Sequence, residues 1–361
     1  MSDKRRYYID NIRSFGVILV LIYHVFYIYN GIGVLGGFPI SQSIGIFDDF
    51  STIVYPWMMI LLFVAAGIAA KFSLEKRTGK QFISERLRKL IIPSVLGVFV
   101  VHWVTGYINM YLGGGLSIIP SFLVYPISVL AGSGHLWFAH VLFLYSVVLF
   151  LFRKPIDRLK KSGERANLII SLAFGILIWL GAQTLNMPVI TVYRFGIYFV
   201  AFIIGYCVFS HESIIKKLEK SRYISLALTI VFGVVYFVLF RKMNYTEPVV
   251  LKNIITNFYA WCAVLAIFGF GRRYLDKENA FSRYLVTNSY GYYILHYPIL
   301  MCSAYLLHIY TDLGVLAKIF ITLIMEVVLT IVANEIIKRI PLVRYLVLGI
   351  KRRKNEIQID N

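Results

Sequence analysis

An arginine and a histidine near the start of the sequence, Arg13 and His24, are eleven residues apart in a stretch that becomes apolar at Ser14. At about 100° per residue, eleven residues complete roughly three helical turns, so both side chains would lie on one face of a helix, about 16 Å apart along its axis. Asp10 and Asn11 lie about one turn before Arg13. A guanidinium binds phosphate through two parallel hydrogen bonds, and an imidazole can take up a proton near neutral pH. An ionisable residue as deep in an apolar run as His24 is a candidate for a functional site.

The composition places this helix in a membrane. Of the 361 residues, 59% are hydrophobic and 15% are charged, whereas about a quarter of the residues of a soluble domain are charged. The three cysteines, Cys207, Cys262 and Cys302, fall inside apolar runs without the spacing of a zinc site or a disulfide framework. We therefore expect a polytopic, all-α membrane protein, and no metal site.

Apolar runs of about 20 residues, the length that crosses a bilayer, recur along the chain and predict ten transmembrane helices. They cover residues 14–29, 52–70, 91–108, 134–152, 168–184, 193–210, 222–240, 253–271, 284–306 and 315–334. We interpret 1–361 as a single transmembrane domain with tails at 1–13 and 335–361. The basic segment 71–90 could form an interfacial helix. The segment 109–133, rich in glycine, predicts a long outer loop of the kind that is often functional.

The basic residues are distributed unevenly between the two sides of such a bundle. With ten spans, both termini lie on one side, and that side carries all but five of the 37 Lys and Arg residues. The exceptions are Arg194, Arg241, Lys242, Lys252 and Lys318. The positive-inside rule then predicts that both termini are cytoplasmic, in what we expect to be a bacterial cytoplasmic membrane. The net charge of +19 would face anionic membrane lipid rather than nucleic acid.

Polar groups within the predicted spans lie at related depths and suggest a wet cavity in the outer half of the bundle. Besides His24, they are His102, His135, His140, Arg194 and His296. A lone histidine in an apolar helix is, however, often a hydrogen-bonded core residue. That alternative applies most to His102, His140 and His308. Glu326, in the last predicted span, could equally pair with another helix.

Four segments together resemble the acyltransferase family 3, a family of polytopic membrane acyltransferases. They are Asp10-Asn11 with Arg13, ten residues and His24; Gly134-His135-Leu136-Trp137-Phe138; Arg194 with Phe202 and Gly205-Tyr206; and the run from Ser289 to Pro298, which contains Leu295-His296-Tyr297-Pro298. The Asp-Asn start and the closing Ile340-Pro341-Leu342-Val343-Arg344 are most similar to the branch that acylates periplasmic glucans.

The resemblance implies transfer of an acyl group, such as acetyl or succinyl, from a cytoplasmic CoA thioester to a hydroxyl of an exported or cell-envelope carbohydrate. Acyl-CoA would be the donor substrate, and no bound cofactor is expected. His24 would act as the base and Arg13 would hold the CoA phosphates, whereas Arg194 or His135 would orient the acceptor or stabilise the oxyanion. The candidate substrate-binding residues are Asp10, His135, Trp137, Arg194, Tyr290, Tyr293 and His296.

Two other classes of function use the same features. A transporter of a small polar or anionic solute would need a polar cavity without chemistry. A structural or lipid-linked membrane partner would need neither donor nor acceptor. Consumption of a thioester by the purified protein separates the acyltransferase from both.

Overall fold

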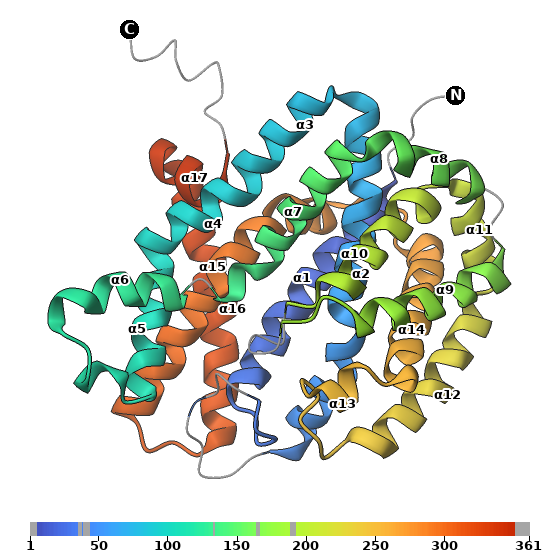
Figure 1. Ribbon diagram of the computed structural model, residues 1–361. Helices are drawn as coiled ribbons and strands as arrows, with labels where there is room; N and C mark the ends of the chain where they lie inside the picture. Colours follow the sequence, from blue (N-terminus) through green and yellow to red (C-terminus); the bar gives the residue numbers. More distant parts are fainter. Residues whose placement is uncertain are drawn as a thin grey trace, which may run out of the picture.

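The computed structural model describes residues 6–34, 38, 44–132, 134–163, 167–187 and 193–350, and within these ranges it is built of helices, with one isolated β-bridge between Asn186 and Arg194. Long helices run side by side through the molecule (Figure 1). The prediction of an all-α polytopic membrane protein is therefore confirmed.

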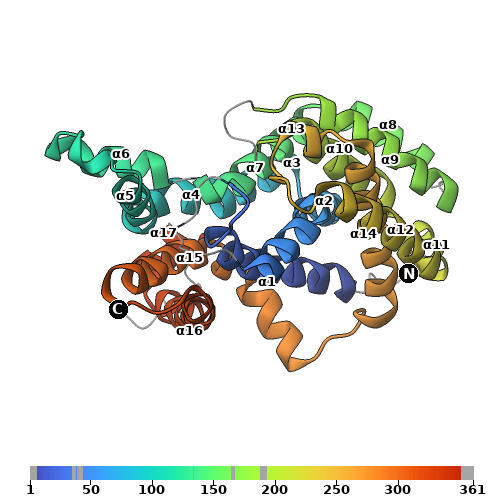
Figure 2. The same ribbon diagram turned by 90° about the horizontal axis from the view of Figure 1, so that it is seen from below.

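The helices α1 (Tyr7–Ile28) and α2 (Gly45–Lys76) lie at the centre. Seen along the bundle, they are flanked on one side by α15 (Ala280–Tyr310) and α16 (Val315–Arg339) and on the other by α12 (Arg222–Phe240) and α14 (Ile254–Tyr274) (Figure 2). Because α1 begins at Tyr7, before the apolar run, Arg13 and His24 belong to the same helix, as the sequence predicts.

Small residues let α2 approach its neighbours closely. A Cβ at Gly67 would collide with the carbonyl oxygen of Phe202, and one at Gly205 would collide with the carbonyl oxygen of Val64. Glycine at such crossings is typical of helix packing in membranes. This contact fixes α2 against α10 (Phe195–Ile204) and the π-helical turn η5 (Gly205–Phe209) that follows it.

Each of the remaining predicted spans also has a helical counterpart. Their bounds are α7 (Trp137–Leu151), α9 (Leu168–Gln183), α10 (Phe195–Ile204) with η5 (Gly205–Phe209), α12 (Arg222–Phe240), α14 (Ile254–Tyr274), α15 (Ala280–Tyr310) and α16 (Val315–Arg339). Among the described residues, seven helices are long and apolar enough to cross a membrane, or eight if α10–η5 and the sharply bent α11 (Glu212–Lys220) form one span. The count of ten stays a prediction.

The segment 71–90 does not form one separate helix, and its place at the membrane surface stays a prediction. Helix α2 continues to Lys76, and a new helix, α3 (Gly79–Arg86), begins after a capping box formed by Thr78 and Gln81. Nothing ends this helix before the next apolar run. It continues through η1 (Leu87–Ile91), α4 (Ile92–Gly97), η2 (Val98–His102) and α5 (Trp103–Leu112).

The predicted outer loop 109–133 is wrong over most of its length. After the short turn η3 (Gly115–Ser117), α6 (Ser121–Gly132) packs back against α5. A Cβ at Gly106 would collide with the carbonyl oxygen of Ser128. The segment is therefore a helical hairpin, which the turn signal at its glycines allows.

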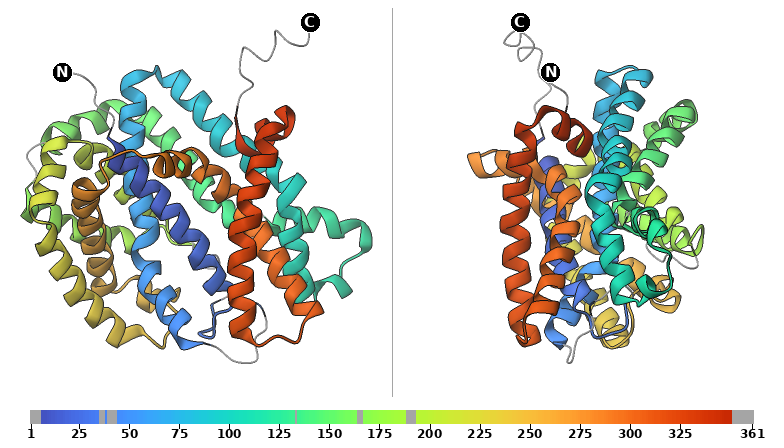
Figure 3. Two further views of the ribbon diagram at one scale, coloured as in Figure 1. Left: turned by 180° about the vertical axis from the view of Figure 1, so that it is seen from behind. Right: turned by 90° about the vertical axis from the view of Figure 1, so that its left-hand side faces the viewer.

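Amphipathic helices occupy the predicted basic loops, α8 (Arg153–Gly163) and α11. The start of α1, helix α3 and the C-terminal α17 (Pro341–Leu348) lie at the same end of the molecule (Figure 3). Helices thus extend into both predicted tails. The first and last described helices, α1 at its start and α17, lie on one side, as an even number of spans requires, and which side is cytoplasmic stays a prediction.

Candidate active site

A cavity of about 640 Å³ lies between α1, α2, α7 and α15 and reaches the end of the bundle that holds α3 and α17. At that end its wall carries six basic residues, which we call the basic mouth: Arg13, Arg77, Arg86, Arg88, Lys89 and Lys338. At the other end the wall contains His24 and His135. These two, with His102 and His296 packed against them, form what we call the histidine end.

The basic mouth holds more positive than negative charge. The wall contributes two carboxylates, Asp10 and Glu85, against six cations. Arg13 lies 3.8 Å from Asp10 and leaves 48% of its side chain exposed. Glu85 is shared between Lys89 at 2.7 Å and Arg77 at 3.1 Å. An anion entering here would meet more cations than carboxylates, and a guanidinium with one carboxylate neighbour has further N–H donors.

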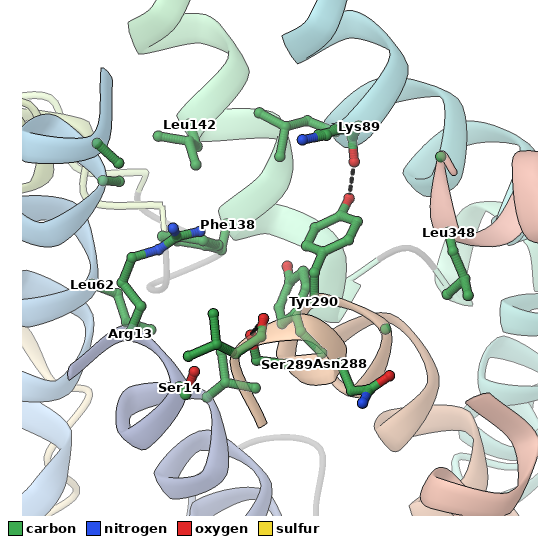
Figure 4. Close-up of a pocket in the computed structure, with 18 of the residues that line it drawn as sticks. Arg13, Ser14, Leu62, Lys89, Phe138, Leu142, Asn288, Ser289, Tyr290 and Leu348 are labelled. Atoms are coloured by element: carbon green, nitrogen blue, oxygen red, sulfur yellow. Dashed lines mark hydrogen bonds between the residues drawn. The ribbon is translucent and has the colours of Figure 1, made fainter. Parts of the chain in front are cut away.

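Apolar side chains separate the mouth from the histidine end. Figure 4 shows Arg13 reaching toward Phe138 of α7, and Tyr290 of α15 pointing toward Lys89. The Tyr290 hydroxyl donates to the Lys89 carbonyl oxygen, which ties α15 to η1. Between the two ends the wall is formed by Val17, Leu62, Ala66, Phe138 and Leu142. Such a passage suits an uncharged chain.

Two histidines meet at the inner end of the passage. The Nδ1 atom of His24 lies 2.9 Å from the Val20 carbonyl oxygen and 3.3 Å from Nε2 of His296. His296 is fully buried, and its Nδ1 lies 2.8 Å from the Tyr293 carbonyl oxygen. The ring centroids of His24 and His296 are 5.2 Å apart.

A second histidine pair lies beside the first. The rings of His102 and His135 are 4.5 Å apart, and His135 also stacks on Tyr297. Both side chains are buried, and none of their four ring nitrogens hydrogen-bonds to the part of the chain that the structure describes. His102 ends the π-helical turn η2, a local distortion that is frequent at functional sites.

Most of the residues expected from the sequence line this cavity. They are Asp10, Arg13, His24, His135, Trp137, Tyr290 and Tyr293. His296 lies behind His24 rather than in the cavity wall. Arg194 lies elsewhere: it is 4% exposed, and its Nη2 donates to the Leu251 carbonyl oxygen at 2.9 Å. Arg194 thus makes a buried hydrogen bond outside this cavity wall, and its contact with the acceptor stays a prediction.

The sequence interpretation missed two groups of residues. His102 was expected in the core, and its pairing with His135 depends on contacts between distant segments. Arg86, Arg88 and Lys89 were assigned to a membrane-surface helix. The only signal that could have placed them is the absence of a helix stop between Arg86 and the apolar run that follows.

Comparison with known proteins identifies the family of the chain. Residues 6–335 match the family described as Acyltransferase domain. The chain is also similar to Glucans biosynthesis protein C of Shigella boydii serotype 4 and of Escherichia coli K12, each 23% identical over 98% of this chain and 97% of the relative. No solved structure matches. Because the family model matches most of this chain, the chain belongs to the acyltransferase family 3 and is a multi-pass membrane O-acyltransferase.

Proposed function

We propose that this O-acyltransferase moves an acyl group of the acetyl or succinyl class from a cytoplasmic CoA thioester to a hydroxyl group of an exported or cell-envelope carbohydrate. The observation that carries the proposal is the continuous cavity, which joins the basic mouth to His24.

The donor matches the cavity in charge and in length. CoA carries a pyrophosphate and a 3′-phosphate at one end, and arginine binds such groups bidentately. The uncharged pantetheine arm would then follow the apolar passage. The distance from Arg13 to His24, about 16 Å along the helix axis, is within the reach of that arm. The thioester would lie beside His24.

The reaction needs one base and no oxidant or reductant. Nε2 of His24 takes the proton of the acceptor hydroxyl while the hydroxyl oxygen attacks the thioester carbonyl carbon. A C–O bond forms, and the C–S bond breaks when the tetrahedral intermediate collapses. The CoA sulfur leaves and takes the proton from His24. His135, at the same end of the cavity, would donate a hydrogen bond to the oxyanion or to the acceptor.

A carbohydrate acceptor is supported by the relatives and by the cavity wall. The relatives carry the name Glucans biosynthesis protein C. Trp137 and Tyr293 supply aromatic surface near the histidine end, and aromatic rings with a polar edge suit a ligand that is partly apolar and partly hydroxylated.

The test is an assay of thioester consumption. The full chain in lipid nanodiscs is mixed with acetyl-CoA or succinyl-CoA, with and without a soluble glucan, and free CoA thiol and acylated glucan are measured. We expect thiol release that depends on the glucan and equals the acyl groups gained. A protein that binds acyl-CoA but releases no thiol, and that moves a solute when placed in vesicles, would instead be a transporter.

A further inference from the structure

His296 lies where a substrate does not reach but where it can act on His24. Its side chain is fully buried, it is absent from the cavity wall, and both of its ring nitrogens have neighbours on the protein. His24, in contrast, lines the cavity. Of the two histidines, only His24 can meet a substrate.

The neighbours of His296 determine where its proton lies. Its Nδ1 is 2.8 Å from the Tyr293 carbonyl oxygen and 3.2 Å from that of Tyr292. A carbonyl oxygen can only accept a hydrogen bond, so Nδ1 carries the hydrogen. In a neutral imidazole the other nitrogen is then an acceptor. Nε2 of His296 therefore presents a lone pair to His24.

The same reasoning applies to His24. Its Nδ1 is 2.9 Å from the Val20 carbonyl oxygen, one turn earlier on α1, and 3.3 Å from the Nε2 lone pair of His296. Both neighbours accept, so Nδ1 carries the hydrogen and shares it between them. Nε2 of His24 is left with its lone pair, and it makes no hydrogen bond to any described residue.

We propose that His296 is a positioning residue for the base. Together with the Val20 carbonyl it holds His24 as the tautomer protonated on Nδ1, with Nε2 free to face the cavity. It also accepts a hydrogen bond from the imidazolium that forms when Nε2 takes the acceptor's proton. The chain of proton positions runs from the Tyr293 carbonyl through His296 and His24 to the substrate. The tautomer of His24 does not depend on the proposed function. Only the hydrogen bond from the imidazolium rests on it.

The proton positions can be measured without activity. The full chain is labelled with ¹⁵N-histidine, placed in nanodiscs and studied by NMR, and the spectra of His24→Gln and His296→Gln identify the two sets of signals. His140→Gln, which removes a half-buried histidine of α7 outside the cavity wall, is the matched control. We expect both His24 and His296 to be protonated on Nδ1 and bare on Nε2. A His24 protonated on Nε2 would overturn the inference.

The positioning role is tested by steady-state kinetics of two substitutions at one site. His296→Ala removes the acceptor, whereas the amide oxygen of His296→Gln can still accept from Nδ1 of His24. Residues that orient metal-bound histidines contribute about 10- to 100-fold, and we expect an effect of the same order for a residue that orients a base. We expect His296→Ala to lower kcat by that factor with the KM for acyl-CoA within about twofold, and His296→Gln to recover at least part of the loss.

The possible failures are distinguishable. Equal losses in His296→Ala and His296→Gln, with both variants as thermally stable as the parent, would show that the side chain has no accepting role. A loss confined to the KM for acyl-CoA would place His296 in the donor site and overturn the inference. A parent protein that consumes no thioester would contradict the proposed function, whereas a His24 protonated on Nε2 contradicts this inference alone.

Discussion

The two ends of the cavity use basic side chains in opposite ways. At the basic mouth, cations such as Arg13 and Lys89 are about half exposed and have carboxylates nearby. At the histidine end, His102, His135 and His296 are buried, and none of the described residues that line the wall there is a carboxylate. Burying an unpaired charge costs far more free energy than burying a hydrogen-bonded neutral group. This difference supports the proposal that charge is recognised at the mouth and that a neutral base takes up the proton at the histidine end.

The two ends also differ in how they are built. The mouth is assembled near Arg13 in the second turn of α1, near Arg86 where α3 passes into η1, and near Lys338 in the last turn of α16. The histidine end is assembled from side chains within long helices or their bends, which neighbouring helices hold. Groups built on packed helices are positioned accurately, and the proposed proton transfer requires such accuracy.

The largest expected effect is in thiol labelling, where one position is labelled and the other is not. The result assigns the two ends of the cavity to the two sides of the membrane. Ser84 of α3 and Ser117 of η3 are both exposed. If the mouth is cytoplasmic, an impermeant thiol reagent applied to intact cells should label Ser117→Cys and not Ser84→Cys. The parent chain, with its own three cysteines, gives the background. The reverse pattern would place the mouth outside, where cytoplasmic CoA cannot enter it.

Next in size is the loss of the base. A positioned general base contributes about 10²- to 10⁴-fold, so His24→Gln should lower kcat by at least two orders of magnitude while the affinity for acyl-CoA stays near that of the parent. Turnover and binding of a non-hydrolysable acyl-CoA analogue are measured on the same preparation. His308→Gln, a histidine outside the cavity wall, is the control. Turnover near the parent rate in a folded His24→Gln would show that the histidine is structural.

Removal of the donor anchor should give the converse result. A hydrogen bond to a charged group contributes about 1.5–3 kcal/mol, so Arg13→Ala should raise the KM for acyl-CoA roughly 10- to 100-fold, with a smaller change in kcat. Arg13→Lys should recover part of the affinity, because an ammonium lacks the planar fork of the guanidinium.

The control for the anchor is Arg283→Ala. Arg283 pairs with Glu278 outside the cavity wall, so its removal should leave the KM unchanged. If Arg13→Ala instead lowers kcat alone, the phosphates do not bind at the mouth. The proposed division between donor binding at the mouth and proton transfer at the histidine end would then be wrong.

The sequence predicted the histidine end better than the mouth, for a physical reason. The placement of Arg13 and His24 on one helix follows from the helical period alone, and α1 confirms it. The basic residues 86–89 have the same pattern whether their helix lies on a membrane surface or enters a bundle. Only the contact of η1 with α7 and α15 decides between the two.

The partners of His102 and Arg194 could not be predicted for the same reason: they lie far away in the sequence. A single histidine in an apolar run carries no information about its partner, so the pairing of His102 with His135 could not be read from either segment. Arg194 was expected at an acceptor site because arginine rarely lies at a span end without a partner. That partner is the Leu251 carbonyl, 57 residues further along the chain.

The smallest effect on turnover is expected for a substitution of Arg194. This substitution tests whether a residue outside the cavity wall takes part in acyl transfer. Arg194→Gln removes the donor to Leu251 but leaves that carbonyl its second donor, the Asn257 side chain at 3.0 Å. The lost hydrogen bond from a charged group should cost about 1.5–3 kcal/mol of folding free energy, measured as a lower Tm of the solubilised protein. At a temperature where the variant is folded, kcat and the KM for acyl-CoA should stay within about twofold of the parent, because the guanidinium does not line the cavity. A fall in acyl transfer with unchanged stability would return Arg194 to the acceptor site and extend the functional region beyond the cavity wall.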